Sequence, residues 1–207
     1  METEVNKKFS GRGKKEADKE EYAIVLDFLP NGYPFDSRPS YLKKPVAQAI
    51  GKRNLALLEL VPKKGVFLQP HETVYIGEGA RDKIHHVSSM ISYDKLTATA
   101  KNELPYAIEQ IIKEREQDFV DFFNKARPLT TRMHSLELLP GLGKKRMWEL
   151  IEARDEKPFE SFEDMRNRIK QLPDIVEMLT KRIIIELSEN EKHRLFVKYK
   201  RETKESH

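Results

Sequence analysis

The chain has 207 residues, of which 38% are hydrophobic and 35% charged, and its formal net charge is +4. This composition excludes a wholly disordered protein and is sufficient for the core of one large domain or two small ones. The absence of cysteine excludes disulfide bonds and thiolate metal sites, and no apolar run approaches the length of a membrane span. We therefore expect a cytoplasmic protein without contact to a membrane. Because the net charge is small, any surface that binds nucleic acid must be a local patch.

The first half of the chain predicts an arm followed by short strands. Residues 1–20 are polar and mixed in charge, and we expect a disordered arm. Segments rich in β-branched and aromatic residues then alternate with proline and glycine turns, which predicts strands at residues 21–29, 45–51, 55–61, 73–76 and 84–93. Five short strands within residues 21–98 indicate a small OB-like or SH3-like β-barrel, and we favour the OB-like form.

The loop after the first predicted strand concentrates aromatic and basic side chains, namely Tyr33, Phe35, Arg38, Tyr41, Lys43 and Lys44. Small barrels bind single-stranded nucleic acid through exposed rings and basic grooves, so these residues are candidates for such a contact. Alternatively, Tyr33 and Phe35 fold back and anchor the loop. The sequence leaves both possibilities open.

A long amphipathic helix is predicted over residues 102–126. Apolar residues recur at spacings of three and four along it, and Arg115 is the one polar break in this stripe. Pro105 lies where a proline is tolerated, in the expected first turn. This helix begins a C-terminal unit that we place at residues 99–190. Residues 128–131 are expected to be a short connector, and Ser135 to cap the following helix.

The most specific pattern is Leu-Pro-Gly-Leu-Gly at residues 139–143, followed by Lys-Lys-Arg. Pro140 ends one helix, while Gly141 and Gly143 permit the positive φ values of a tight turn. The N–H groups that open the next helix lack intrahelical partners and lie at the positive end of its dipole, where a phosphate would bind. The candidate nucleic-acid-binding residues are Gly141, Leu142, Gly143, Lys144, Lys145 and Arg146. Alternatively, the segment is an ordinary αα-hairpin used only for packing.

This segment resembles a helix-hairpin-helix motif, whose core is Leu-Pro-Gly-(Ile/Val/Leu)-Gly. A second copy, Leu-Pro-Asp-Ile-Val at residues 172–176, begins 33 positions after residue 139 and lacks both glycines. Asp174 would also repel a phosphate. We therefore expect tandem hairpins of which only the first binds, and the second is mainly structural. Residues 191–207 form a basic tail that either contacts nucleic acid or returns to the barrel.

Together, the barrel-like half and the segment from His134 to Lys145 resemble the archaeal family called domain of unknown function 655. The resemblance covers nearly the whole chain. It implies an OB-type barrel joined to tandem helix-hairpin-helix motifs, and a protein presumed to bind nucleic acid. The expected fold class is thus α+β, with an OB-like barrel followed by an all-α domain.

The residues that could support catalysis do not form a recognisable set. Acidic residues are scattered along predicted helices, and His71, His85 and His86 lack the spacing of metal ligands. We expect no enzyme activity, metal or cofactor. The predicted function is sequence-independent binding to the phosphate backbone, of DNA more than RNA. Two alternatives remain open: an adaptor that docks on a repair or ribosomal partner, and a metal-dependent nuclease. Oligomeric state is left open.

Overall fold

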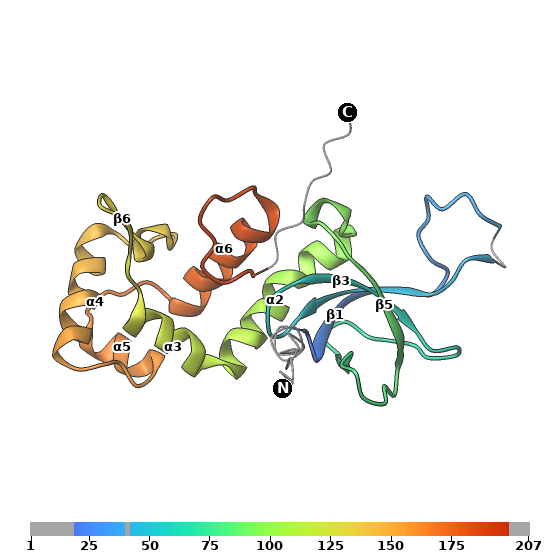
Figure 1. The fold of residues 1–207 in the computed structure, drawn as a ribbon, viewed down its shortest axis with the longest axis horizontal. Coiled ribbons are helices and arrows are strands. Elements are labelled where there is room, and N and C mark those ends of the chain that lie inside the picture. The colour runs from blue at the N-terminus through green and yellow to red at the C-terminus, as the bar shows by residue number, and fades with distance from the viewer. Residues whose placement is uncertain (1–18, 40–41, 199–207) are drawn as a thin grey trace, which may run out of the picture.

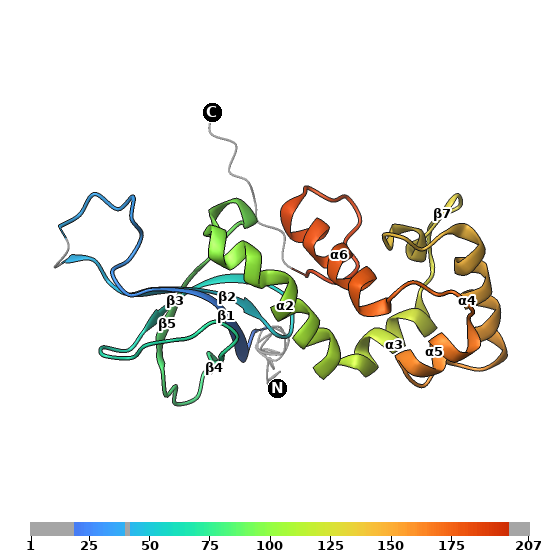
Figure 2. The same ribbon diagram turned by 180° about the vertical axis from the view of Figure 1, so that it is seen from behind.

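The computed structural model describes residues 19–39 and 42–198, arranged as a sheet at one end and helices at the other. The sheet lies at the right of Figure 1, with a projecting loop beyond it, and helices α4 and α5 lie at the far left. Figure 2 shows the same separation from behind. The α+β class predicted from the sequence is confirmed. The predicted arm at residues 1–18 and residues 199–207 of the predicted tail lie outside the described residues.

Five antiparallel strands form one curled sheet. They are β1 (Tyr22–Leu29), β2 (Val46–Gly51), β3 (Leu57–Pro62), β4 (Thr73–Tyr75) and β5 (Ile84–Met90). Their order in the sheet is β4-β1-β2-β3-β5, so β4 and β5 are its two edges. Five strands were predicted at these places, and the structure confirms them. The sheet is a half-barrel, because the described strands form no ladder between β4 and β5.

The two faces of the sheet are both apolar, as expected for a layer covered on both sides. Ile24 and Leu26 of β1 face the helices, while Ala23 and Val25 face the interior of the curl. A bulge between Val25 and Asp27 interrupts this alternation. Asp27 therefore points with the helix-facing residues, where it accepts a hydrogen bond from the Thr97 hydroxyl at 2.6 Å.

The long predicted helix is two helices, α2 (Ala98–Glu114) and α3 (Glu116–Lys125). The break is at Arg115, the residue that interrupts the apolar stripe and whose φ of −117° departs from the helix. Its guanidinium donates to the carbonyls of Lys52 at 2.6 Å and Arg53 at 2.8 Å. The start was also placed too late. Thr97 caps α2 by accepting from the Ala100 N–H at 3.0 Å, so Pro105 lies inside the helix.

The remaining elements follow in chain order. They are η2 (Tyr93–Lys95), β6 (Pro128–Thr130), β7 (Met133–His134), η3 (Ser135–Leu138), α4 (Lys144–Glu156), α5 (Phe162–Arg168) and α6 (Ile175–Ser188). The predicted connector at residues 128–131 is wrong, because β6 and β7 pair as a short antiparallel hairpin.

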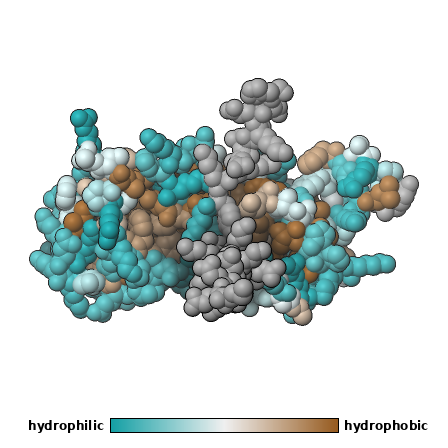
Figure 3. Space-filling view, in the orientation of Figure 1, coloured by the Kyte–Doolittle hydropathy of each residue, from teal (hydrophilic) through white to brown (hydrophobic). Residues whose placement is uncertain are grey.

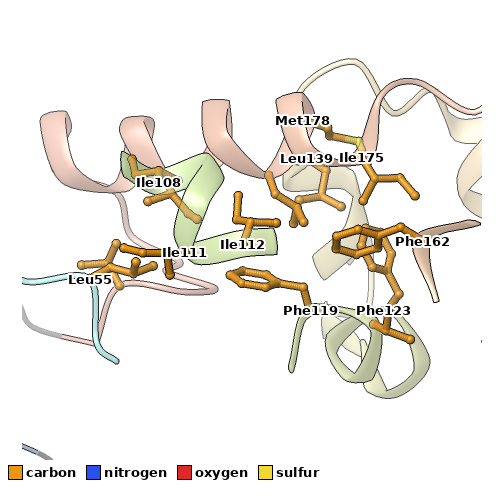
Figure 4. Close-up of a cluster of buried hydrophobic side chains, with 14 of the residues drawn as sticks. Leu55, Ile108, Ile111, Ile112, Phe119, Phe123, Leu139, Phe162, Ile175 and Met178 are labelled. Carbon is orange, nitrogen blue, oxygen red and sulfur yellow. The ribbon is translucent and has the colours of Figure 1, made fainter. Parts of the chain in front are cut away.

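One apolar core runs from the sheet through α2 into the C-terminal helices. Figure 4 shows Leu55 beside Ile111 at one end of this cluster, and Phe123 beside Phe162 and Ile175 at the other. Apolar side chains also reach the surface between α6 and the helices below it (Figure 3), and most of the remaining face is hydrophilic. The division into a barrel at residues 21–98 and a helical domain at residues 99–190 stays a prediction.

The turn between β2 and β3 joins segments from both ends of the chain. The Glu20 carboxylate accepts from the N–H groups of Arg53 and Asn54, both at 2.7 Å, and burial raises its pKa although these donors oppose the rise. The Asn54 carbonyl accepts from the Lys198 N–H at 3.4 Å. Glu20, which was expected in the disordered arm, is therefore bonded to the sheet.

A buried carboxylate holds the segment that was predicted as a tail. Glu186 has 0% of its surface exposed, and it accepts from the backbone N–H groups of Leu195, Phe196 and Val197 at 2.8–3.0 Å. Arg182 donates to the same carboxylate at 2.9 Å. Residues 195–197 are thus fixed against α6, and the Phe196 ring packs on Phe122.

This arrangement predicts a large effect of Glu186→Gln. The substitution removes the charge that pairs with Arg182 and turns an amide N–H₂ toward backbone donors, so we expect unfolding to become easier by about 3 kcal/mol or more. Urea denaturation measures the change. Glu189→Gln, on the exposed end of the same helix, is the matched control and should shift stability by less than about 0.5 kcal/mol. Equal effects would show that the buried pair has no special part in stability.

Candidate nucleic-acid interface

The chain enters the candidate site through η3, whose cap is His134 and not the expected Ser135. His134 Nδ1 accepts from the Leu136 N–H at 3.1 Å, and the Glu137 carboxylate accepts from the His134 N–H at 2.8 Å. This reciprocal capping box satisfies two free donors at the start of the turn. Burial, with a further contribution from the nearby Arg154 charge, lowers the pKa of His134 below its ordinary value.

The glycine turn, residues 139–143, follows η3 and has one position with positive φ. Gly141 has φ +85°, which favours glycine, but Gly143 has φ −68°, which any residue adopts. The prediction that both glycines need positive φ is therefore wrong for Gly143. Leu142, one of the candidate binding residues, is 8% exposed and packs into the core. An added Cβ at either glycine would meet nothing within 4 Å.

Helix α4 begins directly at this turn, and no side chain caps it. Its first N–H groups therefore have no partner within the helix, and the space where a Gly143 side chain would lie is open. The side chains of Lys144 and Lys145 are exposed, and the described residues provide no ion pair to either one. Partial positive charge of the helix end and two full positive charges thus lie together.

The third predicted cation, Arg146, points elsewhere. Its guanidinium donates to both carboxylate oxygens of Glu149, at 2.7 and 2.6 Å, and to the Gln171 side chain at 2.6 Å. These bonds connect α4 to the segment that joins α5 and α6. Arg146 therefore has partners inside the protein, and its part in ligand binding stays a prediction.

A groove of about 540 Å³ runs beside α4 on the side of Arg146. Its lining includes the cations Lys145, Arg146, Arg168 and Lys170 and the carboxylates of Glu149, Glu152 and Glu156. Charges of both signs line the groove in nearly equal number, so its electrostatics neither favour nor exclude a phosphate backbone.

The second predicted hairpin has a different turn. Asp174 caps α6 by accepting from the Glu177 N–H at 2.8 Å, and α6 begins at Ile175, three residues after Leu172. Helix α4 begins five residues after Leu139, so the two Leu-Pro segments do not share one geometry. Positive φ occurs at Gln171, at +57°, before the Leu-Pro pair and not after it. A carboxylate of the protein thus fills the helix end that is open in α4.

Trp148 was not among the predicted site residues. It is 57% exposed and lies four residues after Lys144 on α4, so the two side chains share one face of the helix. The spacing of four was visible in the sequence, but exposure was not. Within the described residues no set of three metal-ligand side chains gathers. Nor do those residues form a helix that combines the length and apolarity needed to cross a bilayer.

Comparisons with known proteins place this chain in a family. The model of a family described as "protein of unknown function (DUF655)" matches residues 19–198, which is most of the chain. The chain belongs to the DUF655 family. A DUF655 relative, "uncharacterized protein MJ0038" of Methanocaldococcus jannaschii, is 48% identical over 88% of this chain and 82% of its own length. The resemblance stated from the sequence is therefore confirmed.

A crystal structure from the same family shows the same fold. Af1531 of Archaeoglobus fulgidus, a DUF655 protein, is 48% identical to this chain, with a TM-score of 0.81. The match covers 86% of this chain and 99% of that one, so it spans the sheet and the helices together.

The cap at His134 predicts a pH dependence of stability in this DUF655 protein. The folded state lowers the pKa of His134, so the unfolded chain binds a proton more readily. The contribution of neutral His134 to the free energy of unfolding is therefore complete above the unfolded pKa of about 6.5 and is lost as the pH falls below it. Thermal melts at several pH values from about 8 to about 5, on both sides of the histidine pKa, measure this loss of stability. His134→Asn keeps an acceptor for the Leu136 N–H but does not titrate, and should flatten the profile. An unchanged slope in this variant would contradict the assignment.

Proposed function

We propose that this protein binds the phosphate backbone of nucleic acid, without catalysis, through the glycine turn and the first turn of α4. The observation that carries the proposal is the uncapped end of α4. Ser161 caps α5 and Asp174 caps α6, so the two helices that follow α4 have side-chain caps, whereas α3, which continues directly from α2, has none. The α4 end has free N–H donors and two exposed lysines instead, which suits an external anion.

Gly143 supports this proposal because the fold itself does not require it. Its φ is ordinary and a side chain would meet no neighbour, so neither backbone strain nor packing explains a glycine. Serine, aspartate or asparagine would cap the helix better. A residue without a side chain is useful here if a phosphate group lies against the backbone and occupies the position of the cap.

The proposal treats residues 135–156 and 162–188 as tandem helix-hairpin-helix units of which the first binds. The first helix of the first unit is the single turn η3, and its rigidity comes from the His134 capping box and the buried Leu142. The strand order β4-β1-β2-β3-β5 fits an OB-type barrel opened between β4 and β5. Contacts to phosphates carry no base information, so little sequence preference is expected from the turn.

The substitution Gly143→Asp tests the proposal sharply. The carboxylate would cap α4 from within, as Asp174 caps α6, and would repel a phosphate from the same donors. We expect stability to stay the same or rise by a few tenths of a kcal/mol, about the advantage of a capping side chain over glycine. Binding should fall at least about tenfold, because a like charge replaces a favourable site. Fluorescence anisotropy with labelled DNA and RNA, in single and double strands, measures it.

The matched control is Asp174→Asn at the start of α6. It keeps a capping oxygen and removes a negative charge from the second hairpin. If that hairpin is structural, affinity should stay within about twofold, a change smaller than 0.5 kcal/mol. A folded Gly143→Asp protein with the affinity of the wild type would rule out the glycine turn as the binding site.

The response to salt follows from the two free lysines. Neutralising about two phosphates gives a slope of log affinity against log salt near −1.8, so affinity should fall about tenfold between roughly 50 and 200 mM salt. Titrations at several potassium chloride concentrations measure the slope. With a double-stranded probe, Lys144→Gln with Lys145→Gln should bring it close to zero, while Lys181→Gln on α6 should leave it unchanged. A steep slope in the double variant would place the ionic contacts elsewhere.

A further inference from the structure

The loop between β1 and β2 carries a stacked aromatic pair at the opposite end of the molecule from α4 (Figure 1). The rings of Tyr33 and Phe35 have centroids 5.0 Å apart and planes inclined by 20°. The loop projects beyond the sheet in both ribbon views. The sequence left open whether these two rings are exposed or fold back to anchor the loop. Tyr33 folds back, and Phe35 is exposed. Tyr41, the third aromatic candidate, lies outside the described residues.

Tyr33 is a rigid base for this pair. Its hydroxyl donates to the Glu59 carboxylate at 2.8 Å and accepts from Gln48 Nε2 at 3.1 Å. Gln48 is fully buried and is itself bonded to the Lys95 carbonyl and the Thr97 N–H, at 2.9 and 2.8 Å. The network fixes the tyrosine ring to the sheet and to the start of α2. Burial raises the pKa of Tyr33 to about 12, so the hydroxyl remains a donor.

Phe35 lies on this base with 83% of its surface exposed. One face of its ring contacts Tyr33, and the other face is therefore available to a ligand. The stack gives the ring a fixed direction before any ligand arrives, which reduces the entropy lost on binding. Apolar side chains gather on the projecting loop in Figure 3, next to hydrophilic ones.

The loop that carries the pair is net positive, while the carboxylates of Glu59 and Asp27 lie near the Tyr33 hydroxyl on the sheet. Residues 30–45 contain three basic side chains and one acidic side chain. The acid, Asp36, is neutralised by Arg38, whose guanidinium donates to both of its oxygens at 2.7–3.0 Å. The remaining cations, Lys43 and Lys44, lie on the returning part of the loop, close to Gly32. An exposed ring beside free positive charge suits a ligand that combines a flat π-system with phosphates.

We propose that Phe35, supported by Tyr33, is a stacking platform for an unpaired base of single-stranded nucleic acid. Lys43 and Lys44 contact the adjoining phosphates. The inference rests on the proposed function in one respect, that nucleic acid is the ligand. It adds a second contact that binds a base and not only phosphates. A base inside a duplex has both faces covered by its neighbours, so the platform selects single strands.

The test compares two probes that share phosphates but not bases. One is a labelled oligodeoxythymidine, and the other is the same sugar-phosphate chain with abasic sites throughout. Anisotropy titrations use the full-length protein, Phe35→Leu, Phe35→Trp and Gly143→Asp. Tyr106→Leu removes an exposed ring from α2 and is the matched control. Because Phe35 is exposed, its variants should melt at the temperature of the wild type.

Stacking on one ring predicts that Phe35→Leu weakens binding of the thymidine probe about tenfold. Binding of the abasic probe should be unchanged, since that probe has nothing to stack. Phe35→Trp should keep or improve the affinity, whereas an apolar socket for a protein partner would accept leucine equally well. Tyr106→Leu should have no effect.

Three results would overturn the platform. Phe35→Leu could leave the thymidine probe unaffected, it could weaken both probes equally, or the wild type could bind no probe. The first two leave the proposed function intact if Gly143→Asp still reduces binding. If the wild type binds no probe, the platform and the proposed function are both contradicted. If Gly143→Asp binds normally while Phe35→Leu loses only the thymidine probe, the platform stands and the glycine turn fails.

Discussion

Burial of α2 on two sides is the constraint on which the rest of the structure depends. Leu104, Ile108 and Ile111 are fully buried, and the helix packs against β1 and β2 on one side and α6 on the other. A helix with apolar residues around so much of its circumference is stable only when both sides are covered. The sheet and the C-terminal helices therefore share one core. The projecting loop and the glycine turn lie at opposite ends of the structure that this core joins.

Polar contacts at the ends of α2 complete this arrangement. At its start, Thr97 and Gln48 join the helix to the sheet and to the base of Tyr33. At its end, Arg115 bonds to two carbonyls of the β2–β3 turn and divides α2 from α3. These bonds join groups that the core already holds in place, so forming them restricts little additional motion. The two candidate binding surfaces, in contrast, have donors and rings that the protein itself does not use.

The local patterns were predictable because they depend on near neighbours in the chain. The five strands and the amphipathic stripe after residue 102 follow from periodicity and turn residues. Contacts between distant residues were not predictable in this way. The bond of Arg115 to residues 52 and 53 divides the predicted helix, and Glu186 captures the predicted tail. Neither partner can be identified from spacing along the sequence.

The sequence by itself determined the α+β class, the family and the position of the glycine turn, because each is encoded within short, continuous segments. Only the tertiary structure decided which groups are free. Arg146 and Lys144 look alike in the sequence, yet Arg146 is bonded to Glu149 and Gln171 while Lys144 is exposed. Tyr33 is likewise anchored while Phe35 is open. Availability to a ligand depends on which partners folding brings within bonding distance, and these partners come from distant parts of the chain.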